Sequence, residues 1–433
     1  MLGTPRIVAI DDDAAHLRGL TDGLSRNGIA CLQIHFTGDL AGIEPCPDVR
    51  IVFADLHLGA GTPSDHKADF AVITALLEDS IKPSGPYFIV LWTQYEDRAP
   101  ALRDYLEDRL GPEVTIPFDV CSLPKSDHID FDRDGEIKDQ GKLIGAIKEI
   151  IRASPEVGAV VEWESQVLGA SGRTVSSILE LVSGADGKER SKELGRILGC
   201  LAVEAVGKDH VERDRFGAVN DALLPILADR IAKTRPGQID DELWRAALAI
   251  PAARERPSDA ESARLNRLVH VAAPAGTKPT ERGAVIALPT EHRACFHDHF
   301  GIAEKDAATK RFRCKNFDAN SDRFRWVLVQ CQAACDYAQS NPGSVPFYLG
   351  LDFPEEHLSS KNPPDSTWRG PMFEFGDQVR RLRVNAGFPF TLAMSAIREV
   401  TPLYRLREQV LNDLAYHLHS HGARPGMMAF GKR

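Results

Sequence analysis

The stretch IVAIDDD, residues 7–13, begins a few positions into the chain and decides the first part of the fold. Four apolar residues in a row are typical of a strand that is buried on both faces, as in a parallel sheet. Three successive carboxylates repel one another and resist burial, so such a cluster at a strand end is expected to hold a cation. The sequence therefore predicts a buried strand that delivers acidic side chains to one edge of a sheet.

Length and composition indicate the class of protein. The 433 residues suggest two to four domains, and 43% hydrophobic with 26% charged residues describes a soluble globular chain. No stretch approaches the roughly 20 apolar residues of a membrane span, and the N-terminus lacks a secretory pattern, so we expect a cytoplasmic protein without membrane contact. The eight scattered cysteines favour reduced thiols. A net charge of -10 argues against wholesale nucleic-acid binding.

The first 153 residues alternate strand-like and helix-like segments. The predicted strands cover 6–10, 30–36, 50–56, 87–93 and 114–120. The predicted helices cover 14–27, 69–79, 96–110 and 141–153, the last with a clear apolar stripe. This order predicts a doubly wound α/β domain of five βα units. In such domains, ligands bind beyond the carboxyl ends of the strands.

Polar side chains with complementary chemistry follow four of the predicted strands. Asp11 and Asp12 follow the first strand, Asp55 the third, Thr93 the fourth and Lys125 the fifth. Carboxylate oxygens suit Mg²⁺, which keeps waters and a phosphate oxygen in its coordination shell. An ammonium and a hydroxyl can bind the remaining phosphoryl oxygens. The pattern predicts that Asp11, Asp12 and Asp55 hold Mg²⁺ beside a phosphoryl group.

This ordered set of residues resembles the receiver domain of bacterial two-component response regulators, over about residues 5–153. The resemblance implies that Asp55 is a phosphoacceptor that takes phosphate from a sensor histidine kinase or a phosphotransfer protein. It also implies that Asp11 and Asp12 hold Mg²⁺, that Thr93 is the switch residue and that Lys125 pairs with the phosphate. The alternative is a receiver-like scaffold that is not phosphorylated and only docks partners.

Several positions depart from the pattern of that family. Gly59 stands where a proline usually follows the phosphoacceptor, and Gln94 stands where a small residue usually follows the switch threonine. Ser126 follows Lys125 in place of a proline, and Ser122 replaces a common aromatic switch residue. We therefore expect narrower access to the phosphoacceptor and a signal transmission that differs from the usual coupling of threonine to an aromatic residue.

The segment DFDRDGEIKDQG, residues 130–141, partly matches a calcium-binding loop. Its first, third and fifth positions and the following glycine fit, but its twelfth position is Gly141, where a bidentate glutamate is needed. No helix pattern precedes the segment. We interpret it as a solvated acidic turn.

The rest of the chain divides into three predicted segments after a receiver-like domain at 1–153. Residues 154–254 show helical periodicity and predict a connector or dimerisation module. A homodimer is one outcome, because amphipathic helices pack equally well within a chain or between two chains. Residues 255–282 are rich in proline, alanine and charge and predict a linker. Residues 283–433 carry strand-like runs and a closing helix, which predict an α+β output domain.

Histidine and cysteine residues gather in two short segments of the predicted output domain. The candidate zinc ligands are His292, Cys295, His297, His299, Cys331, Cys335 and Asp336. Their spacing lacks the paired CxxC knuckles of zinc ribbons, so buried cysteines beside a solvated histidine loop are the alternative. The segment CDYAQ, residues 335–339, faintly resembles a Cys-Asp-x-x-Gln signature of uncharacterised bacterial domains that are joined to receivers.

The sequence allows three classes of function for the predicted output domain, namely nucleic-acid binding, enzymatic activity and interaction with another protein. Residues 380–433 hold nine basic and three acidic residues and could contact nucleic-acid phosphates, although no helix-turn-helix, zinc-finger or zipper pattern is present. A thiol nucleophile at Cys335 would make the domain an enzyme, but it needs a base within reach. An interaction module is the third class. We expect a response regulator whose output is not enzymatic.

Overall fold

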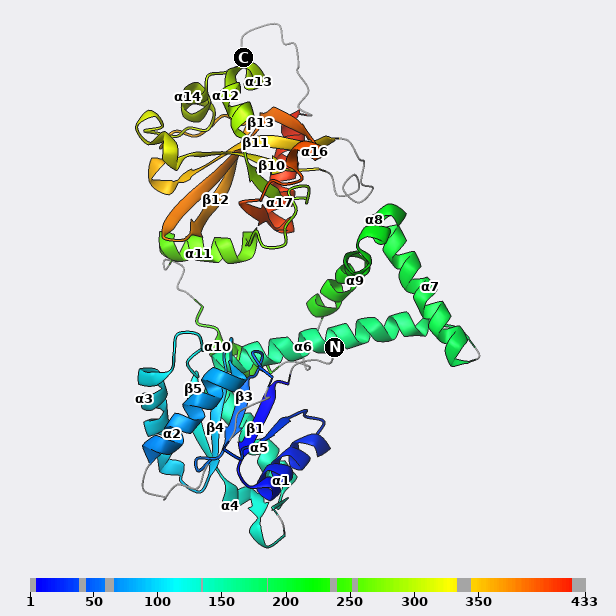
Figure 1. Cartoon of the computed structure of the whole chain (residues 1–433), viewed down its shortest axis with the longest axis vertical. Coiled ribbons are helices and arrows are strands. Elements are labelled where there is room, and N and C mark those ends of the chain that lie inside the picture. Colours follow the sequence, from blue (N-terminus) through cyan, green and yellow to red (C-terminus); the bar gives the residue numbers. More distant parts are fainter. Residues whose placement is uncertain are drawn as a thin grey trace. The chain divides into compact units, whose positions relative to one another are not determined.

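The computed structural model describes residues 5–38, 44–58, 66–133, 135–184, 186–233, 240–250, 256–332 and 344–422 (Figure 1). By its contacts the chain divides into two units, Met1–Ser176 with Leu227–Ile250, and Ser177–Ile226 with Pro251–Arg433. This division differs from the predicted boundaries, because one continuous helix, α6 (Pro155–Glu180), begins in the first unit and ends in the second.

A five-stranded parallel sheet is the centre of the first unit. Its strands are β1 (Ile7–Asp11), β2 (Leu32–His35), β3 (Ile51–Ala54), β4 (Phe88–Thr93) and β5 (Asp119–Pro124). They are ordered β2-β1-β3-β4-β5, and all neighbours are parallel. The chain therefore reverses its direction of travel across the sheet between β1 and β3, which is the topological switch point where ligands bind in open α/β sheets.

Helices cover both faces of this sheet. The main ones are α1 (Ala14–Arg26), α2 (His66–Ala75), α3 (Ala99–Arg109) and α5 (Gln140–Ala153), and a π-helical turn at Leu76–Ile81 extends α2. Leu20 of α1 and Ile147 of α5 pack with Ala9, whereas helices α2 and α3 share the opposite core with Val8 and Ile10. Successive residues of β1 thus face opposite cores. The predicted α/β sandwich is confirmed for this part of the chain.

One detail of the predicted sandwich is wrong. The fifth strand lies at Asp119–Pro124 rather than at 114–120. Pro117 has no N–H to donate to a ladder, so the ladder with β4 begins after it, at Asp119. In addition, no helix occurs among the described residues between β2 and β3 (36–38 and 44–50), so the structure describes a helix after four of the five strands.

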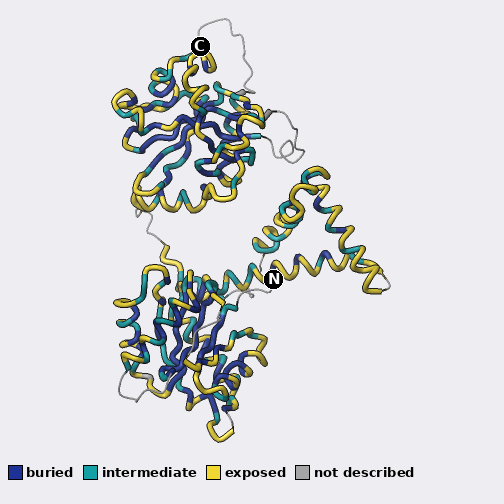
Figure 2. Tube along the Cα trace, viewed as in Figure 1, coloured by how far each residue is buried: buried dark blue, intermediate teal, exposed yellow. Residues whose placement is uncertain are grey.

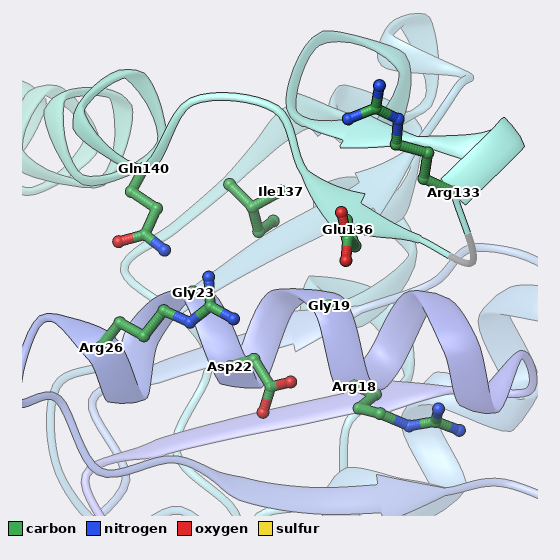
Figure 3. Close-up of a pocket in the computed structure, with 9 residues that line it drawn as sticks. All are labelled: Arg18, Gly19, Asp22, Gly23, Arg26, Arg133, Glu136, Ile137 and Gln140. Carbon is green, nitrogen blue, oxygen red and sulfur yellow. The ribbon is translucent and has the colours of Figure 1, made fainter.

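The segment predicted as a solvated acidic turn, 130–141, has exposed residues at 131–133 and belongs to a small hairpin that packs against α1. The hairpin consists of β6 (Ile129–Asp130) and β7 (Glu136–Ile137) and follows the single-turn helix α4 (Lys125–His128). The contact is close, because a Cβ on Gly19 would lie 1.8 Å from the Gly135 carbonyl oxygen. Beside this contact, side chains of α1 and of the hairpin, including Arg26 and Arg133, line a small polar cavity (Figure 3).

The region predicted to be a helical connector consists largely of helices where it is described. After α6 come α7 (Gly187–Val206), α8 (Lys208–Arg213), α9 (Arg215–Ala232) and α10 (Asp241–Ala247). The first half of α6 belongs to the first unit, because the Glu164 carboxylate accepts bonds of 3.0 and 2.7 Å from the Arg50 guanidinium. Glu162 accepts bonds from the Trp244 indole N–H at 2.5 Å and from the Asp240 N–H at 2.9 Å.

The second unit contains a seven-stranded sheet in the order β12-β13-β11-β10-β9-β14-β8, and all of its neighbours are antiparallel. The strands are β8 (Val271–Ala272), β9 (Ala284–Ala287), β10 (Arg325–Gln330), β11 (Ser344–Pro354), β12 (Thr367–Phe375), β13 (Gln378–Ala393) and β14 (Tyr404–Leu406). Short helices α12 (Thr290–Ala294), α13 (Phe296–Phe300), α14 (Glu304–Asp306) and α16 (Met394–Ile397) and the longer α17 (Glu408–Gly422) accompany it. Buried residues are concentrated in the two sheets (Figure 2).

The predicted linker at 255–282 is wrong in part, because it contains the helix α11 (Asp259–His270). Its start is a capping box in which the Ser258 hydroxyl accepts the Glu261 N–H and the Glu261 carboxylate accepts the Ser258 N–H. The prediction relied on the proline- and charge-rich composition of the whole segment and did not consider the capping box at Ser258 and Glu261. Across the described ranges, no helix combines the length and the apolar character needed to cross a membrane.

Candidate functional site

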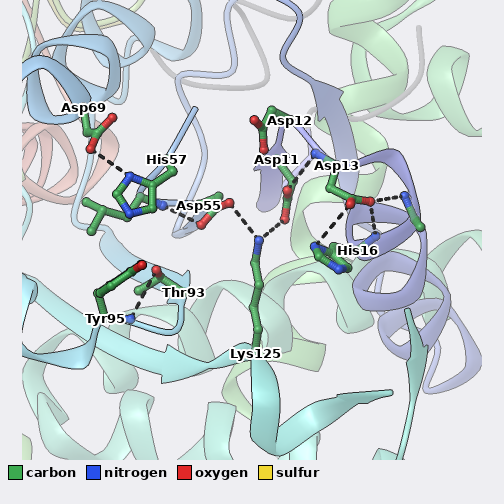
Figure 4. A network of polar contacts seen from close by, with 12 residues as sticks. Asp11, Asp12, Asp13, His16, Asp55, His57, Asp69, Thr93, Tyr95 and Lys125 are labelled. Atoms are coloured by element: carbon green, nitrogen blue, oxygen red, sulfur yellow. Dashed lines mark hydrogen bonds and ion pairs between the residues drawn. The ribbon is translucent and has the colours of Figure 1, made fainter. Parts of the chain in front are cut away.

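Three aspartates meet at the carboxyl ends of β1 and β3. Asp11 is the last residue of β1, Asp12 follows it, and Asp55 follows β3 (Figure 4). One carboxylate oxygen from each lies within 4.8 Å of the others, and no other group of three or more such ligands occurs among the described residues. The site therefore lies at the switch point of the sheet, and this acidic cluster could bind a metal ion.

Lys125 lies between two of these carboxylates. Its Nζ atom is 2.8 Å from Asp11 Oδ2 and 2.8 Å from Asp55 Oδ2. The side chains of Lys125, Asp11 and Asp55 are 5%, 1% and 12% exposed. Lys125 directly follows β5, which is parallel to its neighbour β4. It therefore lies at the same edge of the sheet as the three aspartates. When all four groups are ionised, three carboxylates and one ammonium leave two excess negative charges, which is the charge that a divalent cation neutralises.

Burial and mutual repulsion shift the pKa values of the acidic groups. Desolvation raises the pKa of Asp11 above its ordinary value, and the neighbouring Asp55 raises it further, although Lys125 opposes both. Partial desolvation and Asp55 raise the pKa of Asp12 in the same way. Desolvation acts to lower the pKa of Lys125, but its attraction to Asp55 and Asp11 outweighs this effect and raises that pKa overall. Lys125 is thus fully charged at neutral pH.

Backbone groups hold one oxygen of each carboxylate in place. Asp11 Oδ1 accepts the Asp13 N–H at 2.9 Å, and Asp55 Oδ1 accepts the Leu56 N–H at 2.7 Å. The third aspartate of the opening stretch, Asp13, has a different role, because its carboxylate caps α1 by accepting the N–H groups of Ala15 and His16. Burial acts to raise the pKa of Asp13, but these backbone bonds lower it overall.

Asp12→Asn is expected to stabilise the first unit at neutral pH when no divalent cation is present. The pKa of Asp12 is higher in the folded chain than its ordinary 3.8, so its ionised form costs stability, and this cost develops as the pH rises from 3.8 through the folded pKa. We expect a melting temperature about 2–4 °C higher at pH 7 and a smaller gain near pH 4. Asp108→Asn, on the exposed side of α3, is the control, and an equal gain at both pH values would contradict the assignment.

Thr93 and two residues that the sequence did not suggest lie at the same edge of the sheet. Thr93 is buried at the end of β4, and its hydroxyl accepts a long bond from the Tyr95 N–H at 3.4 Å. His57 Nδ1 lies 2.9 Å from Asp69 Oδ2 in the first turn of α2, and its ring packs edge-on against Tyr95 (Figure 4). No spacing rule relates His57 to Asp69, so only the folded chain reveals this bridge beside Asp55.

The positions that depart from the family pattern are only partly described. Gln94 is exposed, Ser122 lies within β5, and Ser126 lies in α4. Gly59 lies outside the described residues. The Asp55 side chain, which pairs with Lys125, is 12% exposed, and the expected narrow access to it stays a prediction.

The candidate zinc ligands of the second unit do not form a site among the described residues. His292 Nδ1 lies 3.2 Å from His299 Nε2, and both rings pack against Phe390. Cys295, in the turn between α12 and α13, and His297, in α13, are exposed and complete no three-ligand group among the described residues. Cys331 is buried in a separate core, where desolvation raises its pKa to about 12. Cys335 and Asp336 lie outside the described residues.

The predicted basic stripe at 380–433 begins with three arginines that have structural partners. Arg380 is buried and its Nε lies 2.7 Å from Asp352 Oδ1. Arg381 forms two bonds, of 2.7 and 2.9 Å, with the Glu355 carboxylate. The buried Arg383 donates to the carbonyl oxygen of Phe312. These three side chains are therefore not available as an exposed phosphate-binding row. Residues 423–433 lie outside the described part of the chain.

Two comparisons, one with models of protein families and one with solved structures, bear on this chain. No protein-family model matches it, and no solved structure matches it at a significant level. The functional conclusion therefore rests on the strand order, the acidic cluster and the lysine between its carboxylates.

Proposed function

We propose that the first unit is a phosphoacceptor domain of the response-regulator receiver type, in which Asp55 takes up a phosphoryl group in the presence of Mg²⁺. One observation carries this proposal. The carboxylates of Asp11, Asp12 and Asp55 lie within 4.8 Å of one another, and Lys125 Nζ lies 2.8 Å from Asp55. This arrangement combines oxygen ligands for a hard divalent cation with a fixed ammonium for a phosphoryl oxygen.

The strand order supports the same proposal. The order 2-1-3-4-5 is that of flavodoxin-like sheets, in which the ligand lies at the switch point between strands one and three. Asp11 and Asp12 leave β1 and Asp55 leaves β3, so both sides of this switch point are acidic. An acidic switch point suits a metal-bound phosphoryl group better than a free anion, because the carboxylates repel an anion that arrives without a cation.

The proposed transfer uses groups that are already in place. A carboxylate oxygen of Asp55 attacks the phosphorus of a phosphohistidine on a sensor kinase or a phosphotransfer protein. The P–O bond forms, the P–N bond breaks, and its electron pair stays on the donor imidazole. Asp11 and Asp12 would hold the divalent cation, whose charge neutralises the phosphoryl oxygens. Lys125 would bind another phosphoryl oxygen, and the Thr93 hydroxyl would donate to a third.

Phosphorylation would then change the contacts of Lys125 and Thr93. A phosphoryl group adds about -2 charge at the position that Lys125 now shares between Asp11 and Asp55. A shift of Lys125 toward the phosphate acts on α4 and on the β6–β7 hairpin, because Lys125 is the first residue of α4. A differential interaction of a few kcal/mol is sufficient to change the populations of two conformations usefully. The remainder of the chain would be the output of this signal.

Beryllofluoride tests the proposal without a kinase, because it imitates an aspartyl phosphate. The readout is tryptophan fluorescence, to which the buried Trp92 beside Thr93 contributes. We expect a saturable change that requires Mg²⁺ in the wild type and in Asp108→Asn, and at least a tenfold weaker response in Asp55→Asn. Trp92→Phe identifies the contribution of Trp92 to the signal. The same change in Asp55→Asn as in the wild type, or no change in either, would overturn the proposal and favour a docking scaffold.

A further inference from the structure

A cavity of about 240 Å³ lies between helix α1 and the β6–β7 hairpin, and the first residue of α5 also lines it (Figure 3). All of the described residues around it belong to the first unit. Water occupies about 30 Å³ in the liquid, so the cavity has room for roughly eight waters, or for a ligand with about ten non-hydrogen atoms. This is the size of a free amino acid.

Glycines hold the two walls of the cavity at a short distance from each other. A Cβ on Gly19 would lie 1.8 Å from the Gly135 carbonyl oxygen, and a Cβ on Gly23 would lie 2.8 Å from Ile137 Cγ1. Gly135 has a φ of +75°, in the left-handed region that favours glycine. The hairpin therefore packs directly on the backbone of α1, and the cavity lies beside this contact.

Charges of opposite sign alternate along both walls. Arg18, Asp22 and Arg26 are spaced four residues apart, so they lie on one line along α1. The hairpin contributes Arg133 and Glu136 to the opposite wall. A ligand with charge of only one sign meets like charges on both walls, whereas a ligand that carries one group of each sign finds complementary partners.

Several of these polar side chains have no partner within the described chain. Asp22, Arg26, Glu136 and Gln140 form no side-chain hydrogen bond or ion pair with any described residue. Asp22 and Arg26 have the spacing at which acidic and basic residues of a helix commonly pair, and yet they remain apart. Figure 3 shows the Arg26 guanidinium and the Gln140 amide on the same side of the cavity. These groups are therefore available to a ligand.

We propose that this cavity binds a free α-amino acid. The Arg26 guanidinium and the Gln140 side-chain N–H donate to the carboxylate of the ligand, and the carboxylates of Asp22 and Glu136 accept hydrogen bonds from its ammonium group. The side chain of the amino acid lies against Ile137 and the glycine backbone of α1. Both walls contribute to the site, so the bound amino acid joins the hairpin to α1.

The bound amino acid acts on the acidic site through the hairpin, an extension that rests on the proposed function. The hairpin follows α4, which begins at Lys125, and Lys138 at its end donates from Nζ to the Ser126 carbonyl oxygen at 2.7 Å. A ligand that fixes the hairpin on α1 therefore favours the present position of Lys125, between Asp11 and Asp55. It opposes a shift of Lys125 toward a phosphoryl group, and each ligand lowers the affinity for the other by the same factor.

Isothermal titration calorimetry of the full chain without Mg²⁺ tests the binding, so this test does not depend on phosphoryl transfer. Each of the common L-amino acids is titrated separately. We expect at least one of them to bind with a Kd below about 1 mM. Arg26→Ala should weaken this binding by about tenfold or more, because hydrogen bonds to a charged group are lost. The N-acetyl and amide derivatives of the same amino acid, which each lack one charge, should also bind at least about tenfold more weakly.

Arg109→Ala is the matched control for Arg26→Ala. Both arginines lie in the last turn of a helix, α3 and α1 respectively, so both changes remove a favourable charge at a helix C-terminus. Arg109 does not line the cavity, and its variant should bind like the wild type. Glu136→Gln should weaken binding by about tenfold, with the exposed Glu107→Gln as its control. Binding of none of the amino acids would overturn the proposal, and so would binding that Arg26→Ala and Glu136→Gln leave unchanged in folded protein.

Beryllofluoride titrations test the effect on the acidic site. With the amino acid at saturation, we expect the Mg²⁺-dependent fluorescence response of the wild type to require about fivefold more beryllofluoride, and the response of Arg26→Ala to stay the same. An unchanged response of the wild type, in a chain that binds the amino acid, would overturn the coupling. A chain that binds the amino acid without any response to beryllofluoride would contradict the phosphoacceptor and support the cavity as a separate binding site.

Discussion

Lys125→Ala is expected to destabilise the first unit by about 3–5 kcal/mol at pH 7 without divalent cation, the usual loss when one partner of a buried ion pair is removed. The Lys125 ammonium is the counter-charge that lies 2.8 Å from both Asp11 Oδ2 and Asp55 Oδ2. Without it, two nearly buried carboxylates face each other, although desolvation already raises the pKa of Asp11. Chemical denaturation of the variant and the wild type, followed through a probe in the first unit, measures the loss.

The pH dependence separates this electrostatic effect from lost packing. The raised pKa of Lys125 means that its stabilising charge is fully present below the ordinary 10.5 and is lost only as the pH rises through the folded value. Toward pH 4, in contrast, the Asp11 carboxyl, whose pKa desolvation raises and which loses the opposing charge of Lys125 in the variant, takes up a proton, so the deficit should shrink. Lys125→Ala with Asp55→Asn should be more stable than Lys125→Ala alone. Lys142→Ala, at an exposed pair with Asp127, should cost less than about 1 kcal/mol, and a similarly small loss at Lys125 would contradict the assignment.

The acidic site could be predicted because the carboxyl ends of parallel strands meet at one edge of the sheet. To predict that Asp11, Asp12 and Asp55 lie together, it is sufficient to know the positions of two buried strands, β1 and β3. Lys125 lies at this edge although the bounds predicted for the fifth strand were wrong, because it directly follows the C-terminal end of β5. The ion pairs of Lys125 with two carboxylates required the folded chain, since no sequence pattern sets the direction of a lysine side chain.

The features that the sequence did not predict depend on contacts between segments that are far apart in the chain. The bond between His57 and Asp69 joins a strand end to the first turn of a helix, and no periodicity relates them. The boundary predicted at residue 153 fell where α6 begins, but Glu164 binds Arg50 and ties the first half of this helix to the sheet. Arginines in a strand look exposed in a sequence, because the partner that allows their burial lies on another strand.

Arg380→Met is the second change for which we expect a large effect, a loss of about 3–5 kcal/mol in the stability of the second unit. Arg380 Nε lies 2.7 Å from Asp352 Oδ1, and its Nη2 donates to the carbonyl oxygens of Asp352 and Arg323. Asp352 is buried on the neighbouring strand, where desolvation raises its pKa and Arg380 opposes that effect. Removing the arginine therefore leaves a buried carboxylate without this counter-charge and removes one donor from each of the two carbonyl groups.

A double variant distinguishes the loss of this pair from the loss of a binding surface. Arg380→Met with Asp352→Leu should recover much of the stability, because apolar residues of similar volume often replace a buried ion pair at little cost. Arg398→Met, at an exposed arginine of the same segment, should change the free energy of unfolding by less than about 0.5 kcal/mol. If Arg380 bound nucleic acid, Arg380→Met would weaken binding in a protein of unchanged stability. Because its guanidinium is buried against Asp352, we expect the reverse, a loss of stability that becomes smaller toward pH 4 as Asp352 takes up a proton.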